Sequence, residues 1–361
     1  MKTLLLSTSS LWNCGDDFIR DGVLELLCPN DDVRTLWWNR GYGIQNTYAN
    51  DLDINLALTD YFIVAGTPKW VFKNEQIYRY CLDKKIPMSL IGVGTRDLIA
   101  KSQYELMKKV AASGLCEVCL TRDRLAHEAL KELGFSNVEM ILDPCFFKPV
   151  LLEQEKKWHV LSWREQYNFD ADPQLLSNYP GYVLKNVWSK FVTKSENWKQ
   201  KRHEFNHRMI EVFNNLPEPK MVTVHDNREV VKAQELFGKD AVFYSTDSNE
   251  LFKKYAQARS FIGTRIHGAV PSFIHGTPIH LIYTTEKAGL LNDAAHILSQ
   301  YDPELARYIH VDFYSKPDDI KEPALPDIPL TQERLMDIIG QEKKRAYEIL
   351  KAQPILSTYM Q

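Results

Sequence analysis

The chain has 361 residues, of which 44% are hydrophobic and 25% charged, and its formal net charge is −3. This length suits about two domains, and the near-neutral charge gives no global basic field, so we expect no nucleic-acid partner. No run of about 18 apolar residues is present, and the apolar run at residues 4–6 is too short for a secretory signal, so neither a transmembrane helix nor a leader is expected.

Two of the six cysteines, Cys116 and Cys119, have the spacing of paired metal ligands. A zinc site needs four ligands, and no second pair follows. Alternation along a strand would also place these two side chains on opposite faces. We therefore favour a structural role over zinc or redox chemistry, identify no metal site, and expect a reduced, cytoplasmic protein.

Strands and helices alternate through residues 1–150, which predicts a Rossmann-like domain built on a doubly wound parallel sheet. After a strand at residues 3–7, Asp16 or Asp17 can cap the first helix, so Asn13 and Gly15 lie in the first βα turn. Further strands are predicted at residues 60–65, 87–93, 116–120 and 138–142, with helices at 74–84, 104–113 and 124–133.

A second Rossmann-like domain is predicted over residues 158–312, with strands at 159–162, 220–224, 241–244, 261–262 and 279–283. Residues 165–216 form an aromatic-rich insertion whose rings could stack on a sugar or, as is more common, on the core. His275 and His280 fall within packed elements and are assigned either to the core or to positions that support the site from behind. Residues 313–361 follow as a proline-rich connector and a C-terminal helix.

The most informative stretch, residues 260–287, predicts a βαβ unit. Arg265 and His267 stand where its first strand passes into its helix, and Arg164 also follows a strand. Ligands of open α/β sheets bind at the carboxyl ends of strands, and a helix N-terminus there attracts anions. An anion site with a titratable group is one interpretation, and a surface pair in a structural turn is the other.

Two further strand ends carry candidate residues. His225 and Asp226 follow the strand at 220–224, where Asp226 could orient the imidazole or cap the next helix, with capping the safer assignment. Asp16 could act as a base or as a cap. Arg122 and Asp123 are interpreted as a structural pair at a helix start.

The chain resembles the polysaccharide pyruvyl transferase family from Asn13 to about Leu290. The resemblance rests on the N-x-G-D turn at residues 13–16, the G-V-G loop at 92–94, the R-D pair at 122–123, the D-P pair at 143–144 and, above all, GTRIHGAVPSFIHGTPIHLIYTTEK. This chain departs from the family at Ala65-Gly66-Thr67-Pro68 and between Tyr283 and Lys287, which leaves the acceptor and the donor open.

The resemblance implies a GT-B-like architecture of two Rossmann-like domains facing across a cleft. It also implies transfer of a pyruvyl group from phosphoenolpyruvate to a saccharide in cell-envelope or exopolysaccharide biosynthesis, with ketal formation, release of phosphate, and no cofactor or metal. The donor's phosphate and carboxylate call for cationic groups, and protons must move near neutral pH. We assign catalysis to His267 and Asp16. Donor binding is assigned to Arg265, Arg164, Lys287 and the helix-terminal N–H groups after His267, including that of Gly268. Secondary candidates are His225, Asp226 and Asn13.

Two alternatives stay open: a GT-B-like glycosyltransferase that uses a nucleotide sugar, and a non-catalytic saccharide-binding subunit of the same fold. A lipid-linked acceptor would place the enzyme at the inner face of the membrane without spanning it. The acceptor sugar, the linkage, the ketal stereochemistry, the oligomeric state and the role of residues 165–216 are left open.

Overall fold

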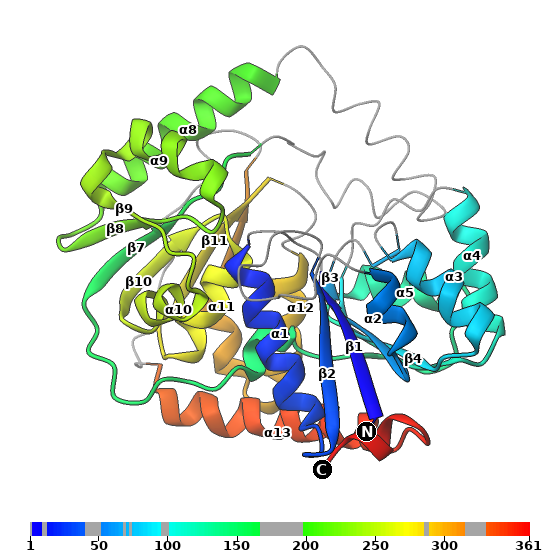
Figure 1. Cartoon of the computed structure of the whole chain (residues 1–361). Helices are drawn as coiled ribbons and strands as arrows, with labels where there is room; N and C mark the ends of the chain where they lie inside the picture. The colour runs from blue at the N-terminus through cyan, green and yellow to red at the C-terminus, as the bar shows by residue number, and fades with distance from the viewer. Residues whose placement is uncertain are drawn as a thin grey trace. The chain divides into compact units, whose positions relative to one another are not determined.

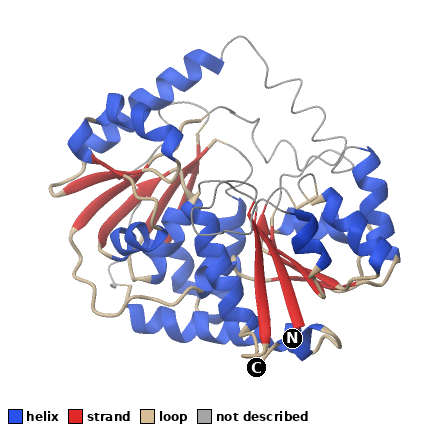
Figure 2. Ribbon diagram, viewed as in Figure 1, coloured by secondary structure: helices blue, strands red, loops and turns tan. Residues whose placement is uncertain are grey.

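The computed structural model describes residues 2–8, 13–39, 52–67, 70–71, 74–94, 101–166, 198–284, 289–314 and 330–361. The chain divides into two compact units, Met1–Pro149 with Ile339–Gln361, and Val150–Ile338. Each unit is a parallel sheet flanked by helices (Figure 2). The last residues join the first unit, where the Arg345 guanidinium donates a 2.6 Å hydrogen bond to the carbonyl of Met140.

The first sheet has, in the described part of its unit, six parallel strands in the order β2-β1-β3-β4-β5-β6. Its central strands are buried on both faces, which is why they are nearly continuous apolar runs in the sequence. The strands are β1 (Lys2–Thr8), β2 (Val33–Asn39), β3 (Tyr61–Thr67), β4 (Met88–Val93), β5 (Cys116–Thr121) and β6 (Val138–Met140). The helical elements are α1 (Cys14–Leu27), α2 (Leu52–Ala57), α3 (Glu75–Lys84), α4 (Lys101–Ala112), α5 (Arg124–Glu132) and η1 (Pro144–Phe147).

The second sheet also has six parallel strands among its described residues, in the order β12-β11-β10-β7-β8-β9. They are β7 (Trp158–Ser162), β8 (Lys220–Thr223), β9 (Val242–Phe243), β10 (Ala258–Gly263), β11 (Ile279–Tyr283) and β12 (Ile309–Phe313). The helical elements are α8 (Trp198–Asn215), α9 (Asn227–Phe237), η2 (Lys239–Ala241), α10 (Ser248–Ala256), α11 (Ile266–Ile274), α12 (Gly289–Tyr301) and η4 (Pro303–Tyr308). Helix α13 (Gln332–Lys351) leads back to the first unit, where η6 (Leu356–Tyr359) follows it.

In the second unit, α8 and α9 lie on one side of the sheet and α10 and α11 on the other (Figure 1). Chain order turns back between β7 and β10, which are neighbours in the sheet although β8 and β9 come between them in sequence. Such a reversal leaves a crevice at the carboxyl ends of the two strands, where doubly wound folds bind ligands. The arginines predicted to bind the donor follow these two strands.

The sequence analysis missed two strands, β2 and β12, which both lie at an edge of a sheet. An edge strand is covered on fewer sides, so its sequence needs less apolar character. In β12, only Ile309 is fully buried, and polar residues such as His310 and Asp312 alternate with apolar ones. A search for buried apolar runs therefore passes over it.

The expectation that Cys116 and Cys119 point to opposite faces is wrong, because their sulfur atoms lie 3.6 Å apart. The register between β4 and β5 passes from Met88 paired with Cys116 directly to Ser89 paired with Val118. This irregularity leaves Glu117 as an extra residue and breaks the alternation of side chains. Both cysteines are free thiols.

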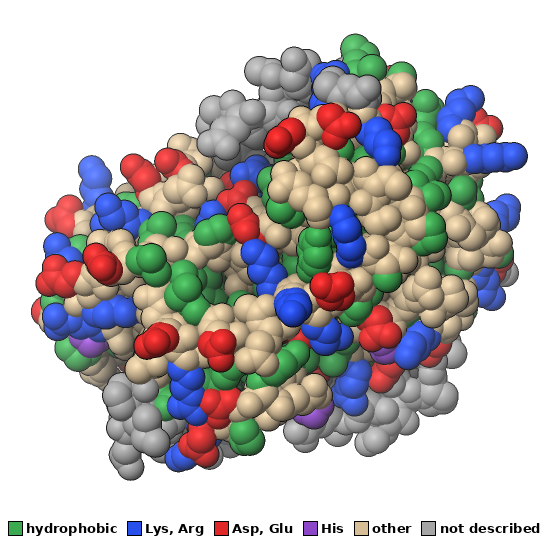
Figure 3. Space-filling model, turned by 90° about the horizontal axis from the view of Figure 1, so that it is seen from below, with side chains coloured by type: hydrophobic (Ala, Val, Ile, Leu, Met, Phe, Trp, Pro, Cys, Tyr) green, Lys and Arg blue, Asp and Glu red, His purple; other side chains and the backbone are tan. Residues whose placement is uncertain are grey.

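Charged side chains of both signs are interspersed over the face of the molecule seen in Figure 3, in keeping with the small net charge. No single-sign field stands out on that face. Among the described residues, no helix is both long enough and apolar enough to cross a membrane.

Candidate functional site

The turn between β10 and α11 lies against the end of β7. Gly263, the last residue of β10, pairs with Ser162, and the N–H of Thr264 donates a 2.8 Å hydrogen bond to the Ser162 carbonyl. A Cβ atom at Gly263 would lie only 2.4 Å from that carbonyl oxygen, so the strands approach this closely because a glycine is present. Arg164 and Arg265 each follow two residues after these paired strand ends.

Arg265 forms a buried ion pair with Glu229, and the two side chains are only 9% and 10% exposed. The sequence analysis treated Arg265 as a cation available to a donor and did not foresee this carboxylate. Glu229 comes three residues after Asp226, the cap of α9, which is the position of the acidic residue in a capping box. That spacing was the one signal in the sequence that could have drawn attention to Glu229.

Burial raises the pKa of Glu229, and the positive charges of Arg265 and Arg164 reduce that shift without cancelling it. The Nε atom of Arg265 is buried and has no hydrogen-bond partner among the described residues. The guanidinium is therefore held by Glu229 but still has a donor to offer a ligand.

His225 lies beside this pair and is almost completely buried. Burial is the main reason why the pKa of His225 is well below its ordinary value of 6.5. Positive charges add to the shift, namely those of Arg265, His267 and Arg164. The structure thus gathers both predicted arginines and the predicted catalytic histidine around one neutral imidazole.

A tyrosine that the sequence analysis did not single out, Tyr255 of α10, joins this imidazole to the sheet. Its hydroxyl lies 2.6 Å from Nε2 of His225, 2.8 Å from the hydroxyl of Thr223 and 2.9 Å from that of Ser162. All four residues are buried. This arrangement allows a neutral His225 to accept a hydrogen bond from the tyrosine O–H while the other two hydroxyls donate to the tyrosine oxygen.

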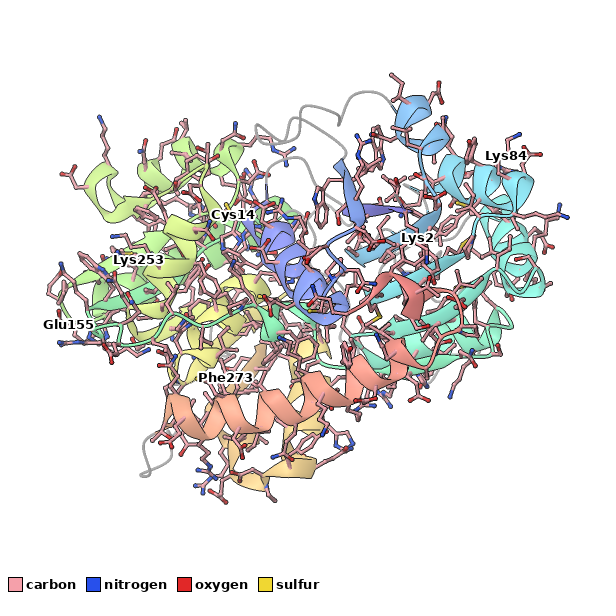
Figure 4. All side chains as sticks on the ribbon, turned by 60° about the horizontal axis from the view of Figure 1, so that its bottom comes forward. Lys2, Cys14, Lys84, Glu155, Lys253 and Phe273 are labelled. Carbon is pink, nitrogen blue, oxygen red and sulfur yellow. The ribbon has the colours of Figure 1, made fainter. Side chains whose placement is uncertain are left out.

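Gly268 has a role that differs from the predicted one. Its N–H was expected to bind an anion, but it donates a 3.0 Å hydrogen bond to the carbonyl of Arg265, as does that of Ala269. The helix starts at Ile266, so these amides already belong to its first turns. A Cβ at position 268 would lie 2.7 Å from the hydroxyl of Ser162 and 2.8 Å from that of Tyr255. Gly268 therefore lets α11, marked by Phe273 in Figure 4, pack closely against the hydroxyls of Ser162 and Tyr255.

His267 is half-buried in the first turn of α11, so it can reach solvent or a ligand. Asp226, a secondary candidate, caps α9 by accepting a 3.0 Å hydrogen bond from the N–H of Arg228. Burial acts to raise the pKa of Asp226, but the hydrogen bonds from Arg228 outweigh it and the pKa is lowered. The capping role expected from the sequence is the one that the structure shows.

In the first unit, the turn after β1 is capped by Asn13 and not by Asp16 or Asp17 as expected. The Asn13 side chain accepts a 3.2 Å hydrogen bond from the N–H of Gly15, and α1 starts at Cys14, which is labelled in Figure 4. The cap lies earlier because an asparagine is as good a cap as an aspartate. Asp16 is buried in the first turn of the helix, where the helix dipole stabilises its carboxylate.

The remaining motifs of the first unit serve packing. Arg122 forms a 2.7 Å ion pair with Asp143, whose side chain is 0% exposed, so the R-D and D-P motifs are joined. Asp123 caps α5 by accepting a 2.8 Å hydrogen bond from the N–H of Ala126. At Gly94, a Cβ would lie 2.4 Å from Nε of Arg122. The G-V-G loop thus makes room for the ion pair.

Three predictions fall outside the described residues, wholly or in part. Lys287, predicted to bind the donor, is one. Residues 167–197, the greater part of the aromatic-rich insertion, and residues 315–329 of the connector are the others. At the start of that insertion, Glu165 forms a 3.3 Å ion pair with Arg202 of α8.

A protein-family model for polysaccharide pyruvyl transferases matches residues 13–286, which is most of the chain. The chain belongs to the polysaccharide pyruvyl transferase family. The match ends one residue before Lys287 and includes every other residue predicted for the site. Of the curated proteins, none matches the sequence.

Solved structures of other proteins are similar to this family member to different degrees. MnaA from S. aureus, solved with UDP, aligns with a TM-score of 0.52 at 10% identity, over 100% of this chain and 93% of that chain. UDP-GlcNAc 2-epimerase from Neisseria meningitidis, bound to UDP-GlcNAc, aligns with a TM-score of 0.49 at 10% identity, over 96% of this chain and 100% of that chain. With two parallel-sheet α/β units, the architecture is GT-B-like. Similarity at such low sequence identity shows a shared fold and does not show a shared function.

Proposed function

We propose that this protein transfers the pyruvyl group of phosphoenolpyruvate to a saccharide. Membership of the family supports the reaction class. The observation that carries the proposal is the gathering of Arg164, Arg265 and His267 around His225 where chain order reverses between β7 and β10. Guanidinium groups match phosphate and carboxylate oxygens, and phosphoenolpyruvate carries one of each.

Ketal formation joins two saccharide hydroxyls to C2 of the enolpyruvyl group. The C3 methylene gains a proton and becomes a methyl group, and the bond between C2 and the phosphate oxygen breaks. Each attacking hydroxyl loses its proton, so one of the two protons balances the methyl group and the other leaves with inorganic phosphate. The reaction needs no redox partner, but it does need a group that moves protons near neutral pH.

His267 is the residue to which we assign this proton transfer, because an imidazole can both donate and accept a proton and this one is half-buried near the arginines. His225 is less suited to the task, since it is almost completely buried and its Nε2 is engaged by the Tyr255 hydroxyl. Instead, the buried Tyr255 hydroxyl links α10 to His225 and to Ser162 at the end of β7, the strand that Arg164 follows. Glu229 fixes the direction of Arg265, whose Nε remains to donate to the donor substrate.

A donor screen tests the proposal. Purified protein is offered phosphoenolpyruvate with simple glycosides, and released phosphate and the mass of the glycoside are measured. We expect phosphate release that depends on the glycoside and a product heavier by one pyruvyl ketal. Phosphoenolpyruvate left intact with every glycoside, together with turnover of a nucleotide sugar, would overturn the proposal.

A GT-B-like glycosyltransferase that uses a nucleotide sugar is the second candidate. Counted from β7, the strands of the second sheet have the order 3-2-1-4-5-6 of dinucleotide-binding folds. MnaA, similar in fold, was solved with UDP. Protection against thermal unfolding separates the two candidates: phosphoenolpyruvate should raise the melting temperature under the first and UDP under the second.

A non-catalytic subunit of the same fold would bind saccharide without consuming either donor, which the same assays detect. The proposed acceptor is a cell-envelope or exopolysaccharide precursor, and a lipid-linked one would bring the protein to the inner face of the membrane. Sedimentation with liposomes tests this part separately, because pyruvyl transfer to a soluble glycoside does not require the membrane.

A further inference from the structure

Three metal-ligating side chains meet on β11 and β12, apart from the anion site. They are His280, His310 and Asp312, and their ligand atoms all lie within 4.8 Å of one another. Nε2 of His280 is 2.8 Å from one oxygen of Asp312, and Nε2 of His310 is 3.0 Å from the other. The strand register explains the meeting: His280 pairs directly with His310, and Asp312 lies two residues farther along on the same face.

The group does not satisfy its own hydrogen-bonding needs. Nε2 of His310 is buried and has no hydrogen-bond partner among the described residues, although it lies 3.0 Å from a carboxylate oxygen of Asp312. The hydrogen bond described within the group runs from Nε2 of His280 to Asp312. A buried polar atom without a partner is costly, which makes a purely structural histidine pair a poor explanation.

We propose that His280, His310 and Asp312 bind a divalent first-row transition metal ion, with Zn²⁺ as the best fit. Two histidines and a carboxylate with one open position form a common ligand set for zinc. Ligands of a tetrahedral zinc ion lie about 3.3 Å apart. This is a few tenths of an ångström beyond the two histidine–carboxylate contacts, of 2.8 and 3.0 Å. The side chains of His310 and Asp312 are 37% and 16% exposed, which gives the ion a way in.

The ion would join the edge strand β12 to β11, its neighbour in the described sheet. Both histidines come second in their strands, near the amino ends, whereas the arginines of the anion site follow the carboxyl ends of β7 and β10. The role inferred for the ion is accordingly to stabilise the second unit, and the inference stands whether or not the protein transfers pyruvyl groups.

Chelator-treated full-length protein is titrated with Zn²⁺ by calorimetry, and with Co²⁺ by absorption spectroscopy. We expect one ion per chain, a higher melting temperature with zinc, and a Co²⁺ spectrum without a thiolate charge-transfer band. The last point matters because the chain has six free cysteines. His310→Ala and Asp312→Asn should each weaken binding by more than the roughly 10–100-fold that loss of a supporting residue costs.

His207→Ala is the matched control, since His207 is exposed and also contacts a carboxylate, that of Glu211, at 3.2 Å. It should bind zinc like the unmodified protein. The proposal is overturned if the unmodified protein shows no stoichiometric site, if both ligand variants keep it, or if a thiolate band places the ion at cysteines. His310 is half-exposed, so its alanine variant should fold, and circular dichroism in chelator verifies this.

Discussion

Each unit of this protein holds a buried arginine paired with a carboxylate beyond the end of a strand: Arg122 with Asp143 in the first, and Arg265 with Glu229 in the second. In the first unit the pair is enclosed, because Asp143 also accepts a hydrogen bond from the N–H of Cys145 and Gly94 packs on the arginine. In the second unit the half-buried His267 and Arg164 lie near the buried His225 beside the pair.

The same kind of contact can thus be part of the packing in one place and part of a candidate site in another. The two ion pairs differ in the residues that surround them. A half-buried histidine, a second arginine and a reversal in strand order accompany the pair in the second unit. Four predictions test this difference.

The largest effect should come from His267→Ala. Loss of a positioned acid or base lowers turnover about 10²–10⁴-fold, measured as release of phosphate from phosphoenolpyruvate in the presence of a glycoside. His296→Ala, at an exposed position of α12, is the control and should keep full activity. Equal turnover in the two variants would remove His267 from the proposed mechanism.

Breaking each ion pair compares the units directly. Arg122→Met and Arg265→Met should both lower the free energy of unfolding by about 3–5 kcal/mol, because each leaves a buried carboxylate without its partner. Only Arg265→Met should also raise the phosphoenolpyruvate concentration needed for half-maximal turnover. Urea denaturation and donor titration measure the two effects. A rise of similar size in Arg122→Met would show that the first pair is more than packing.

Acid should loosen the second unit before the first. Burial lowers the pKa of His275 from 6.5 to about 4. His275 lies at the C-terminal end of α11, and its Nε2 atom accepts a 2.9 Å hydrogen bond from the N–H of Leu151. The unfolded chain takes up the proton below pH 6.5 and the folded chain does not, so stability falls as the pH falls from 6.5 towards 4.

The loss from His275 alone should be about 3 kcal/mol over this range. His225, with its strongly lowered pKa, adds to it, whereas His127 is the one histidine of the first unit. Hydrogen exchange at pH 7 and at pH 4.5 resolves the two units. Earlier loss of protection in the first unit would contradict the prediction.

The smallest effects come from two glycines. Gly268→Ala should cost about 1–3 kcal/mol of unfolding free energy, because its Cβ meets the hydroxyls of Ser162 and Tyr255. Gly340→Ala, within α13 and with nothing within 4 Å of the added Cβ, should stabilise the protein by about 0.5–1 kcal/mol. Thermal denaturation compares the two variants. An unchanged melting temperature for Gly268→Ala would mean that the Ser162 and Tyr255 hydroxyls can move aside.

The sequence by itself determined the fold class, and it pointed to the candidate site. Alternating apolar strands and helices predict two parallel sheets, and the R-x-H turn at residues 265–267 was found from a local pattern, since strand, turn and helix follow one another in the chain. Capping by Asp226 is local in the same way. The edge strands β2 and β12 were missed, because partial exposure weakens the apolar signal.

Contacts between distant parts of the chain were decided only by the tertiary structure. Glu229 and Arg265 are 36 residues apart, and Tyr255 and His225 are 30 apart. His280 meets Asp312 across 32 residues. Strand order and register bring these residues together, and a register irregularity does the same for Cys116 and Cys119. Such features depend on how elements pack in space, which residue spacing along the chain does not encode.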